Sequence, residues 1–99
     1  MQSSYEDVQG QKPVVAFATS KSADEYMGCM MPRAVDIWPT ASTMRDGNSW
    51  VIRILENQDL AAVTIAPGAN GASVELREWT GPTVRSRFQR MREAVEACR

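Results

Sequence analysis

The sequence contains no histidine, and its two cysteines, Cys29 and Cys98, lie far apart in the chain. Without histidine, the commonest general base and metal ligand is missing, and with it the Ser-His-Asp and Cys-His arrangements of nucleophilic enzymes. Cysteines this far apart also lack the C-x-x-C spacing of a zinc site or of a thioredoxin-like redox pair. The sequence therefore predicts a protein that is not an enzyme, with no catalytic residues, no metal site and no cofactor.

Long apolar runs and an excess of charge are lacking as well. No stretch approaches the length of about 18 apolar residues that a membrane span needs, and the N-terminus lacks the basic and apolar segments of an intact signal peptide. The formal net charge is −1, so no global electrostatic reason favours nucleic acid or an anionic membrane as a partner. With 99 residues, 43% of them apolar, the chain suits one domain with a single core.

Residues 1–11 are mostly polar, with only Tyr5 and Val8 as larger apolar groups. We interpret residues 1–11 as a flexible leader and residues 12–99 as a single α+β domain. A polar tether ahead of a domain suits an envelope protein that is held on the membrane by a lipid attached upstream of it. An ordinary disordered terminus has the same composition, and both interpretations stay open.

The next segment carries first a strand signal and then a helix signal. Residues 14–19 form an apolar run too short for a helix, which predicts a buried strand. Ser22 and Glu25 have the S-x-x-E spacing of a helix start, and we expect the helix that follows to end before Pro39. Pro32 lies inside this helix, and we expect its missing amide to kink or break it.

Beyond this helix the apolar pattern alternates, and turn residues divide the middle of the chain. They predict four strands in an antiparallel meander, near residues 42–45, 49–56, 60–66 and 72–79. A last helix is indicated by an apolar stripe, preceded by Thr83 as the expected cap and made by Val84, Phe88, Met91, Val95 and Cys98. The predicted fold is α+β, an antiparallel sheet of about five strands with two helices on one face, in the order β-α-β-β-β-β-α.

The two cysteines lie on the apolar stripes of the two predicted helices. Ala23, Tyr26 and Met30 accompany Cys29 at helical spacing, and the last helix carries Cys98 on its own stripe. Because both helices are expected to cover one sheet face, the thiols are placed to form a disulfide, while two separately buried free cysteines are the alternative. A disulfide that closes a loop of about 70 residues would contribute roughly 4 kcal/mol and would indicate an oxidising compartment.

Two surfaces are candidates for binding. Strand alternation puts an apolar patch edged by arginine on the sheet face that we expect to be uncovered, made by Val51, Arg53, Leu55, Arg77 and Trp79. The outer side of the last helix is locally basic and suits phosphate groups or other anions, through Arg85, Arg87, Arg90 and Arg92. Two plainer interpretations stay open: the leader or a second subunit covers the sheet face, and the arginines form an ordinary solvated helix face.

The predicted order of elements resembles the β-α-β4-α topology of the TATA-binding-protein-like fold, which is also found in bacterial envelope lipoproteins. The segment from Lys21 to Pro39, with its Ser-Ala-Asp-Glu-Tyr opening and Cys29 ahead of Pro32, is similar to small bacterial secreted or lipoprotein domains that carry a second cysteine near the C-terminus. The resemblance implies a cell-envelope location and a structural or binding role, and it carries over no catalytic residue. DNA binding does not follow from the name of the fold.

These observations predict a non-enzymatic domain of the bacterial periplasm, or one that is anchored to the membrane and faces the periplasm. We expect it to bind a protein partner or a second copy of itself through the exposed sheet face. The alternative is a small-ligand or anion binder that uses the arginines of the last helix.

Overall fold

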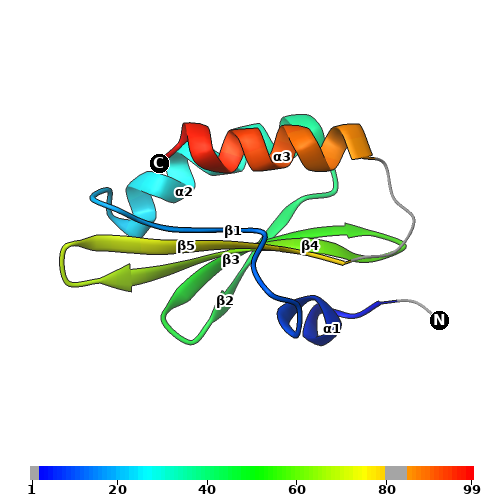
Figure 1. Ribbon diagram of the computed structural model, residues 1–99, viewed down its shortest axis with the longest axis horizontal. Coiled ribbons are helices and arrows are strands. Elements are labelled where there is room, and N and C mark those ends of the chain that lie inside the picture. Colours follow the sequence, from blue (N-terminus) through cyan, green and yellow to red (C-terminus); the bar gives the residue numbers. More distant parts are fainter. Residues whose placement is uncertain (1–2, 80–84) are drawn as a thin grey trace.

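The computed structural model describes residues 3–79 and 85–99 (Figure 1). These residues form three helices and five strands: α1 Tyr5–Gln9, β1 Val15–Thr19, α2 Ala23–Ile37, β2 Ser42–Asp46, β3 Ser49–Glu56, β4 Gln58–Gly68, β5 Gly71–Glu78 and α3 Arg85–Ala97. The predicted strands and both predicted helices are present within a few residues of their expected bounds. None of the described helices is long and apolar enough to cross a membrane.

The strands of the described chain belong to one antiparallel sheet with the order β1-β5-β4-β3-β2. β2 to β5 form a meander of consecutive hairpins, as the short turns predict. β1 pairs with β5 at one edge, with Phe17 opposite Val74. The predicted α+β class with a five-stranded antiparallel sheet is confirmed.

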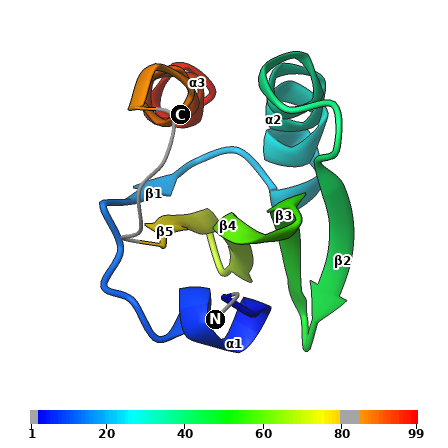
Figure 2. The ribbon, with the colours of Figure 1, turned by 90° about the vertical axis from the view of Figure 1, so that its right-hand side faces the viewer.

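The helices lie on both faces of the sheet, with α2 and α3 on one face and α1 on the other (Figure 2). The main core lies between the sheet and the α2/α3 pair, and it contains the fully buried side chains of Tyr26, Met30, Ile52, Leu76 and Met91. The prediction of two helices on one face is confirmed. Helix α1 on the opposite face is an additional element that the sequence pattern did not predict.

Helix α1 corrects the expectation of a flexible leader. Ser4 Oγ accepts a hydrogen bond from the Asp7 amide, and the Asp7 carboxylate accepts one from the Ser4 amide, so two amides at the helix start are satisfied. Val8 is fully buried against Val51 and Ala62. Because a helix of this length is marginal in water by itself, its contacts with the sheet are what stabilise it.

Helix α2 begins with the predicted capping box. Ser22 Oγ accepts from the Glu25 amide, and the hydrogen bonds from Ser22 to the Glu25 carboxylate lower the pKa of Glu25. The expected break at Pro32 does not occur, and α2 is continuous through it. Pro32 has no amide to donate to the Gly28 carbonyl oxygen, while at the neighbouring Cys29 carbonyl oxygen the Arg33 side chain donates from Nη1 at 3.0 Å. Buried residues on both sides of the proline hold the helix on the sheet.

Helix α3 buries the predicted stripe, since Phe88, Met91, Val95 and Cys98 are all buried. The Phe88 ring packs edge-on against Trp38 at the end of α2, with 5.2 Å between the ring centroids. The stripe therefore joins α3 to both the sheet and α2. The remaining residues of this prediction, Thr83 and Val84, lie outside the described residues.

Candidate functional site

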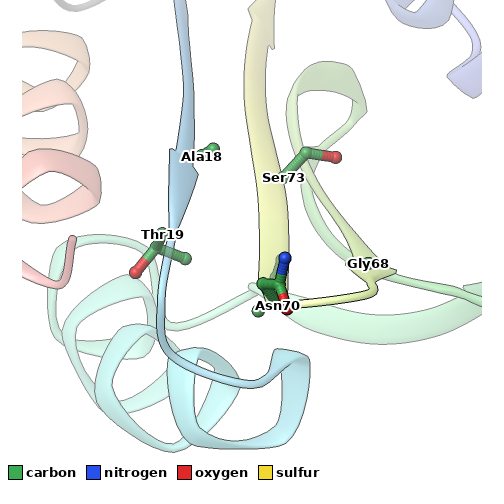
Figure 3. A pocket seen from close by; sticks show the side chains of 7 residues that line it. Ala18, Thr19, Gly68, Asn70 and Ser73 are labelled. Carbon is green, nitrogen blue, oxygen red and sulfur yellow. The ribbon is translucent and has the colours of Figure 1, made fainter.

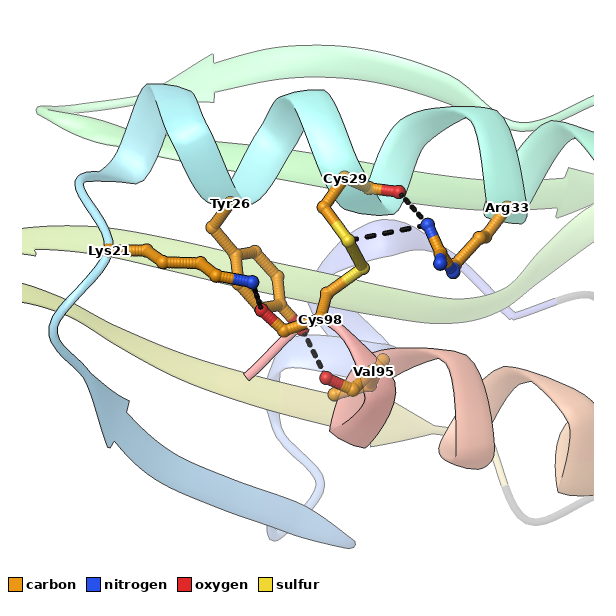
Figure 4. The surroundings of a disulfide bond; sticks show 6 residues. All are labelled: Lys21, Tyr26, Cys29, Arg33, Val95 and Cys98. Atoms are coloured by element: carbon orange, nitrogen blue, oxygen red, sulfur yellow. Dashed lines mark hydrogen bonds between the residues drawn. A yellow bond between two sulfur atoms is a disulfide. The ribbon is translucent and has the colours of Figure 1, made fainter.

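A disulfide joins Cys29 of α2 to Cys98, which directly follows α3 (Figure 4). Their Cα atoms lie 5.8 Å apart, inside the limit of about 7 Å beyond which a bridge cannot form. The predicted pairing is confirmed. Two side chains near the start of α2 also hold the last turn of α3: the Tyr26 hydroxyl donates to the Val95 carbonyl oxygen at 2.7 Å, and Lys21 Nζ donates to the Cys98 carbonyl oxygen at 2.6 Å. Burial raises the pKa of Tyr26, so its hydroxyl remains a donor.

The residues predicted for the sheet-face surface all lie on the face that α1 occupies. They are Val51, Arg53, Leu55, Arg77 and Trp79. Residues directly opposite each other in an antiparallel pair share a face. Arg53 and Arg77 both stand opposite Ala62, which packs under α1, and Leu55 stands opposite Asp59 after a shift in register. Strand alternation therefore placed this set on one side of the sheet.

The centre of this face is covered, which corrects the expectation of an uncovered face. Val8 of α1 packs on Val51 and Ala62, and the half-buried Trp79 packs beside them. As a result Val51 is fully buried and does not reach the surface. The interpretation in which the leader covers the face agrees with the structure.

Polar contacts fix the N-terminal segment on the sheet around this apolar contact. The Ser3 carbonyl oxygen accepts a hydrogen bond from the Asp59 amide at 3.1 Å. The buried Asp59 carboxylate pairs with Arg53, whose Nη2 donates to it at 2.9 Å, and this hydrogen bonding raises the pKa of Arg53. Arg77 Nε donates to the Gln11 carbonyl oxygen at 2.9 Å. These contacts attach both ends of the segment, so α1 is part of the domain.

The side chains that stay accessible around α1 are aromatic, cationic and aliphatic, and we call them the α1-side patch. Its members are Tyr5, Arg53, Leu55, Arg77 and Trp79. Arg53 stacks over Tyr5, with 5.7 Å from its guanidinium carbon to the ring centre. The Tyr5 hydroxyl donates to Asp46 at 3.0 Å, and partial burial raises the pKa of Tyr5. Leu55 is 38% exposed, which leaves an apolar side chain open to a partner.

Sequence reasoning missed Tyr5 and Asp59 as parts of this surface. The spacing of Ser4 and Asp7 is a helix-start signal, and it could have indicated a short helix that contains Val8. Nothing in the local sequence around Asp59 indicates that it would be buried against an arginine of the preceding strand.

Replacing Val8 with alanine should weaken the attachment of α1. The change removes two methyl groups from a fully buried position, and we expect the free energy of unfolding to fall by about 1 to 2 kcal/mol. Urea denaturation followed by tryptophan fluorescence measures the loss, because Trp79 packs beside α1. Glu6→Ala is the matched control at an exposed position of the same helix, and we expect it to stay within about 0.5 kcal/mol of the wild type. Equal stability of the two variants would show that Val8 does not hold α1 in place.

The arginines proposed for anion binding on α3 face carboxylates. The pairs are Arg87 with Glu56 at 3.4 Å, Arg90 with Asp36 at 3.4 Å, and Arg92 with Glu78 through hydrogen bonds of 3.0 and 2.6 Å. The last pair fastens α3 to β5, because Glu78 is buried. Arg85 is the first residue of α3, and its side chain lies outside what the structure describes. An anion at this face would compete with a carboxylate at each of the other three arginines.

Two shallow hollows on the surface are lined by few side chains that could bind or react. One of about 230 Å³ lies where β1 meets the turn between β4 and β5, and it is lined by small neutral residues that include Ala18, Thr19, Asn70 and Ser73 (Figure 3). Another, of about 290 Å³, lies between α2 and α3, where the pair of Asp36 and Arg90 forms part of the lining. Neither lining places a nucleophile beside a general base.

Within residues 3–79 and 85–99, no group of three or more cysteine, aspartate or glutamate side chains is placed to hold a metal ion. No protein family, curated protein or solved structure matches this chain.

Proposed function

We propose that this chain is a non-enzymatic cell-envelope domain, periplasmic or lipid-anchored and facing the periplasm, that binds a protein partner or a second copy of itself. The disulfide supports an extracytoplasmic location, because such bonds persist in oxidising compartments and are rare in the cytosol. The activity is recognition, with no bond made or broken in the partner.

The observation that carries this proposal is the composition of the α1-side patch. Tyrosine, tryptophan and arginine are the residues enriched in the hot spots of protein interfaces. Tyr5, Trp79, Arg53 and Arg77 supply these types on one face, and Leu55 adds an exposed apolar side chain. A partner on this face would bury aromatic and aliphatic surface and would meet two guanidinium groups.

The arginines of the patch are held in place before any partner arrives. Asp59 fixes Arg53 through a pair of hydrogen bonds, and the Gln11 carbonyl oxygen fixes Arg77. A side chain that is already ordered loses less conformational entropy on binding than a free one. What favours the α1-side patch over the α3 arginines is the presence of Tyr5, Trp79 and the exposed Leu55 beside its arginines.

Photo-crosslinking from two exposed apolar positions tests the proposal. The photoreactive amino acid p-benzoylphenylalanine replaces Leu55 in one variant and Val35 on α2 in the other, and the variants are expressed in cells of the source organism. The native side chains are 38% and 40% exposed, so the two positions are matched in access. We expect one crosslinked product of discrete mass from position 55 and none from position 35. Adding Trp79→Ala should lower the yield from position 55 at least about fivefold, because an aromatic anchor is lost.

Crosslinking of the purified protein distinguishes self-association from binding to another protein. A product that contains two copies of the chain and forms with pure protein identifies self-association, while a product that forms only in cells identifies another protein. The Arg87→Gln/Arg90→Gln variant is the control for the opposite face and should leave the yield unchanged. Two results would contradict the proposal: equal yields of crosslinked product from positions 55 and 35, or a yield from position 55 that Trp79→Ala leaves unchanged.

A further inference from the structure

The two sulfur atoms of the disulfide have different surroundings. Cys98 is fully buried in the main core, whereas Cys29 is only half-buried on α2. Opening a disulfide requires a thiolate to reach one of its two sulfur atoms. Of the two cysteines, therefore, only Cys29 is partly exposed to a thiol in solution while the domain is folded.

A guanidinium group stands beside the sulfur of the partly exposed Cys29. Arg33 lies one helical turn after Cys29, and its Nη1 is 3.3 Å from Cys29 Sγ and 3.0 Å from the Cys29 carbonyl oxygen (Figure 4). The hydrogen bond to the carbonyl keeps the positive charge at the sulfur. A cation in this position favours the thiolate form of a cysteine and attracts an anionic thiol from solution.

The contacts around Cys98 act on its backbone and not on its sulfur. Lys21 Nζ binds the Cys98 carbonyl oxygen, and the Tyr26 hydroxyl binds the Val95 carbonyl oxygen. Neither hydrogen bond involves a sulfur atom, so neither is broken when the S–S bond opens. They keep Cys98 close to Cys29 in the opened state.

We propose that the disulfide is opened and closed through Cys29. Cys29 is the residue that forms a mixed disulfide with an anionic low-molecular-weight thiol, and Cys98 is the buried resolving cysteine. Arg33 directs the anionic thiol to Cys29.

In the opening reaction, the incoming thiolate forms a bond with Cys29 Sγ. The bond to Cys98 breaks, its electron pair leaves on Cys98 Sγ, and this thiolate takes a proton from water. A second thiolate then attacks the sulfur of the first thiol in the mixed disulfide, so that a small disulfide leaves and Cys29 is released as a thiolate beside Arg33. Two small thiols are oxidised, and the cysteine pair gains the two electrons.

In the closing reaction, a small disulfide of the same class is the oxidant. The Cys29 thiolate attacks one of its sulfur atoms, and one small thiol leaves. Cys98 loses its proton, attacks Cys29 Sγ and expels the second small thiol. The cysteine pair gives up two electrons, and two small thiols form.

The site of attack is measured on the folded wild-type protein with reduced glutathione, which is an anionic thiol. The oxidised protein reacts with a limiting amount of glutathione, free thiols are blocked with N-ethylmaleimide, and the adduct is mapped by peptide mass. We expect glutathione on Cys29 at least about tenfold more often than on Cys98. An equal distribution, or more adduct on Cys98, would overturn the proposal.

Variants of Arg33 test the role of its charge at an exposed position where the fold should tolerate change. Arg33→Gln removes the charge, and we expect the rate of opening by glutathione to fall about fivefold, while Arg33→Lys stays within about twofold of the wild type. Cysteamine is the control thiol, because its ammonium group cancels the charge of its thiolate. With cysteamine, Arg33→Gln should change the rate by less than about twofold. An unchanged glutathione rate in Arg33→Gln, or an equal loss with cysteamine, would overturn the assignment of Arg33.

Discussion

Gly71→Ala is expected to lower the free energy of unfolding by at least about 3 kcal/mol. Gly71 is the first residue of β5, and its φ of 144° is a conformation that L side chains rarely adopt. A Cβ at this position would lie 2.0 Å from the Thr19 carbonyl oxygen and 2.9 Å from the Ser20 Cα. Both are backbone atoms, so the end of β1 and the turn between β4 and β5 would have to move apart. Urea denaturation followed by circular dichroism measures the loss.

Two other glycines separate this clash from effects of conformation alone. Gly28 lies in α2 with nothing within 4 Å of its Cβ position, so Gly28→Ala should stabilise the domain by about 0.5 to 1 kcal/mol through helix propensity. Gly47 has a φ of 61° and open space around it, so Gly47→Ala should cost about 1 kcal/mol of backbone strain. A loss for Gly71→Ala no larger than that for Gly47→Ala would mean that β1 does not end against this turn.

Local patterns predicted α2, α3 and the strands because the causes of those elements are local. The capping box of Ser22 and Glu25 depends on two side chains and the amides of one helical turn, and it is present. The spacing of Phe88, Met91 and Val95 defines one face of a helix whatever lies opposite, and that face is buried. The meander follows from connections too short for a parallel crossover.

Features that depend on contacts between distant segments could not be predicted in this way. β1 pairs with β5, which places Phe17 opposite Val74, and a lone strand carries no local signal for its partner. Helix α1 has a start signal in Ser4 and Asp7, but with only Tyr5 and Val8 as larger apolar residues it shows no helical period, so its docking on the sheet could not be predicted. Pro32 was expected to interrupt α2, but the packing of the residues on both sides of it outweighs the missing amide.

The sequence could predict which face of the sheet carries the candidate residues, but it could not predict that α1 covers the centre of that face. Alternation along β3 and β5 puts Arg53 and Arg77 on the face away from α2 and α3. Whether that face is open depends on another segment, and Val8 closes its centre. Ion pairing also depends on the tertiary structure: Arg92 belongs to a basic helix face in the sequence, yet it hydrogen-bonds to the buried Glu78 of the sheet. The accessible surface is therefore narrower than the predicted one, and it gains Tyr5 from the leader.

Reduction of the Cys29–Cys98 bond is expected to lower the free energy of unfolding by about 4 kcal/mol. The two residues are 69 positions apart, and opening so long a loop restores conformational freedom to the unfolded chain. Urea denaturation with and without reductant measures the difference, and intact mass after alkylation verifies the state of the thiols. Both sulfur atoms remain in the reduced protein, so the packing around Cys98 is kept. The difference in free energy of unfolding therefore measures the effect of the cross-link alone.

The Cys29→Ala/Cys98→Ala variant separates packing from the cross-link, since it should lose about 1 kcal/mol more than the reduced wild type through the cavity at the buried Cys98. A small domain has only about 5 to 15 kcal/mol of stability in total, so the loss of the bond should remove a large share of it. If the reduced protein instead keeps its stability within about 1 kcal/mol, burial of Phe88, Met91 and Val95 is enough to hold α3. The bond would then matter for its reactivity at Cys29 and not for the stability of the fold.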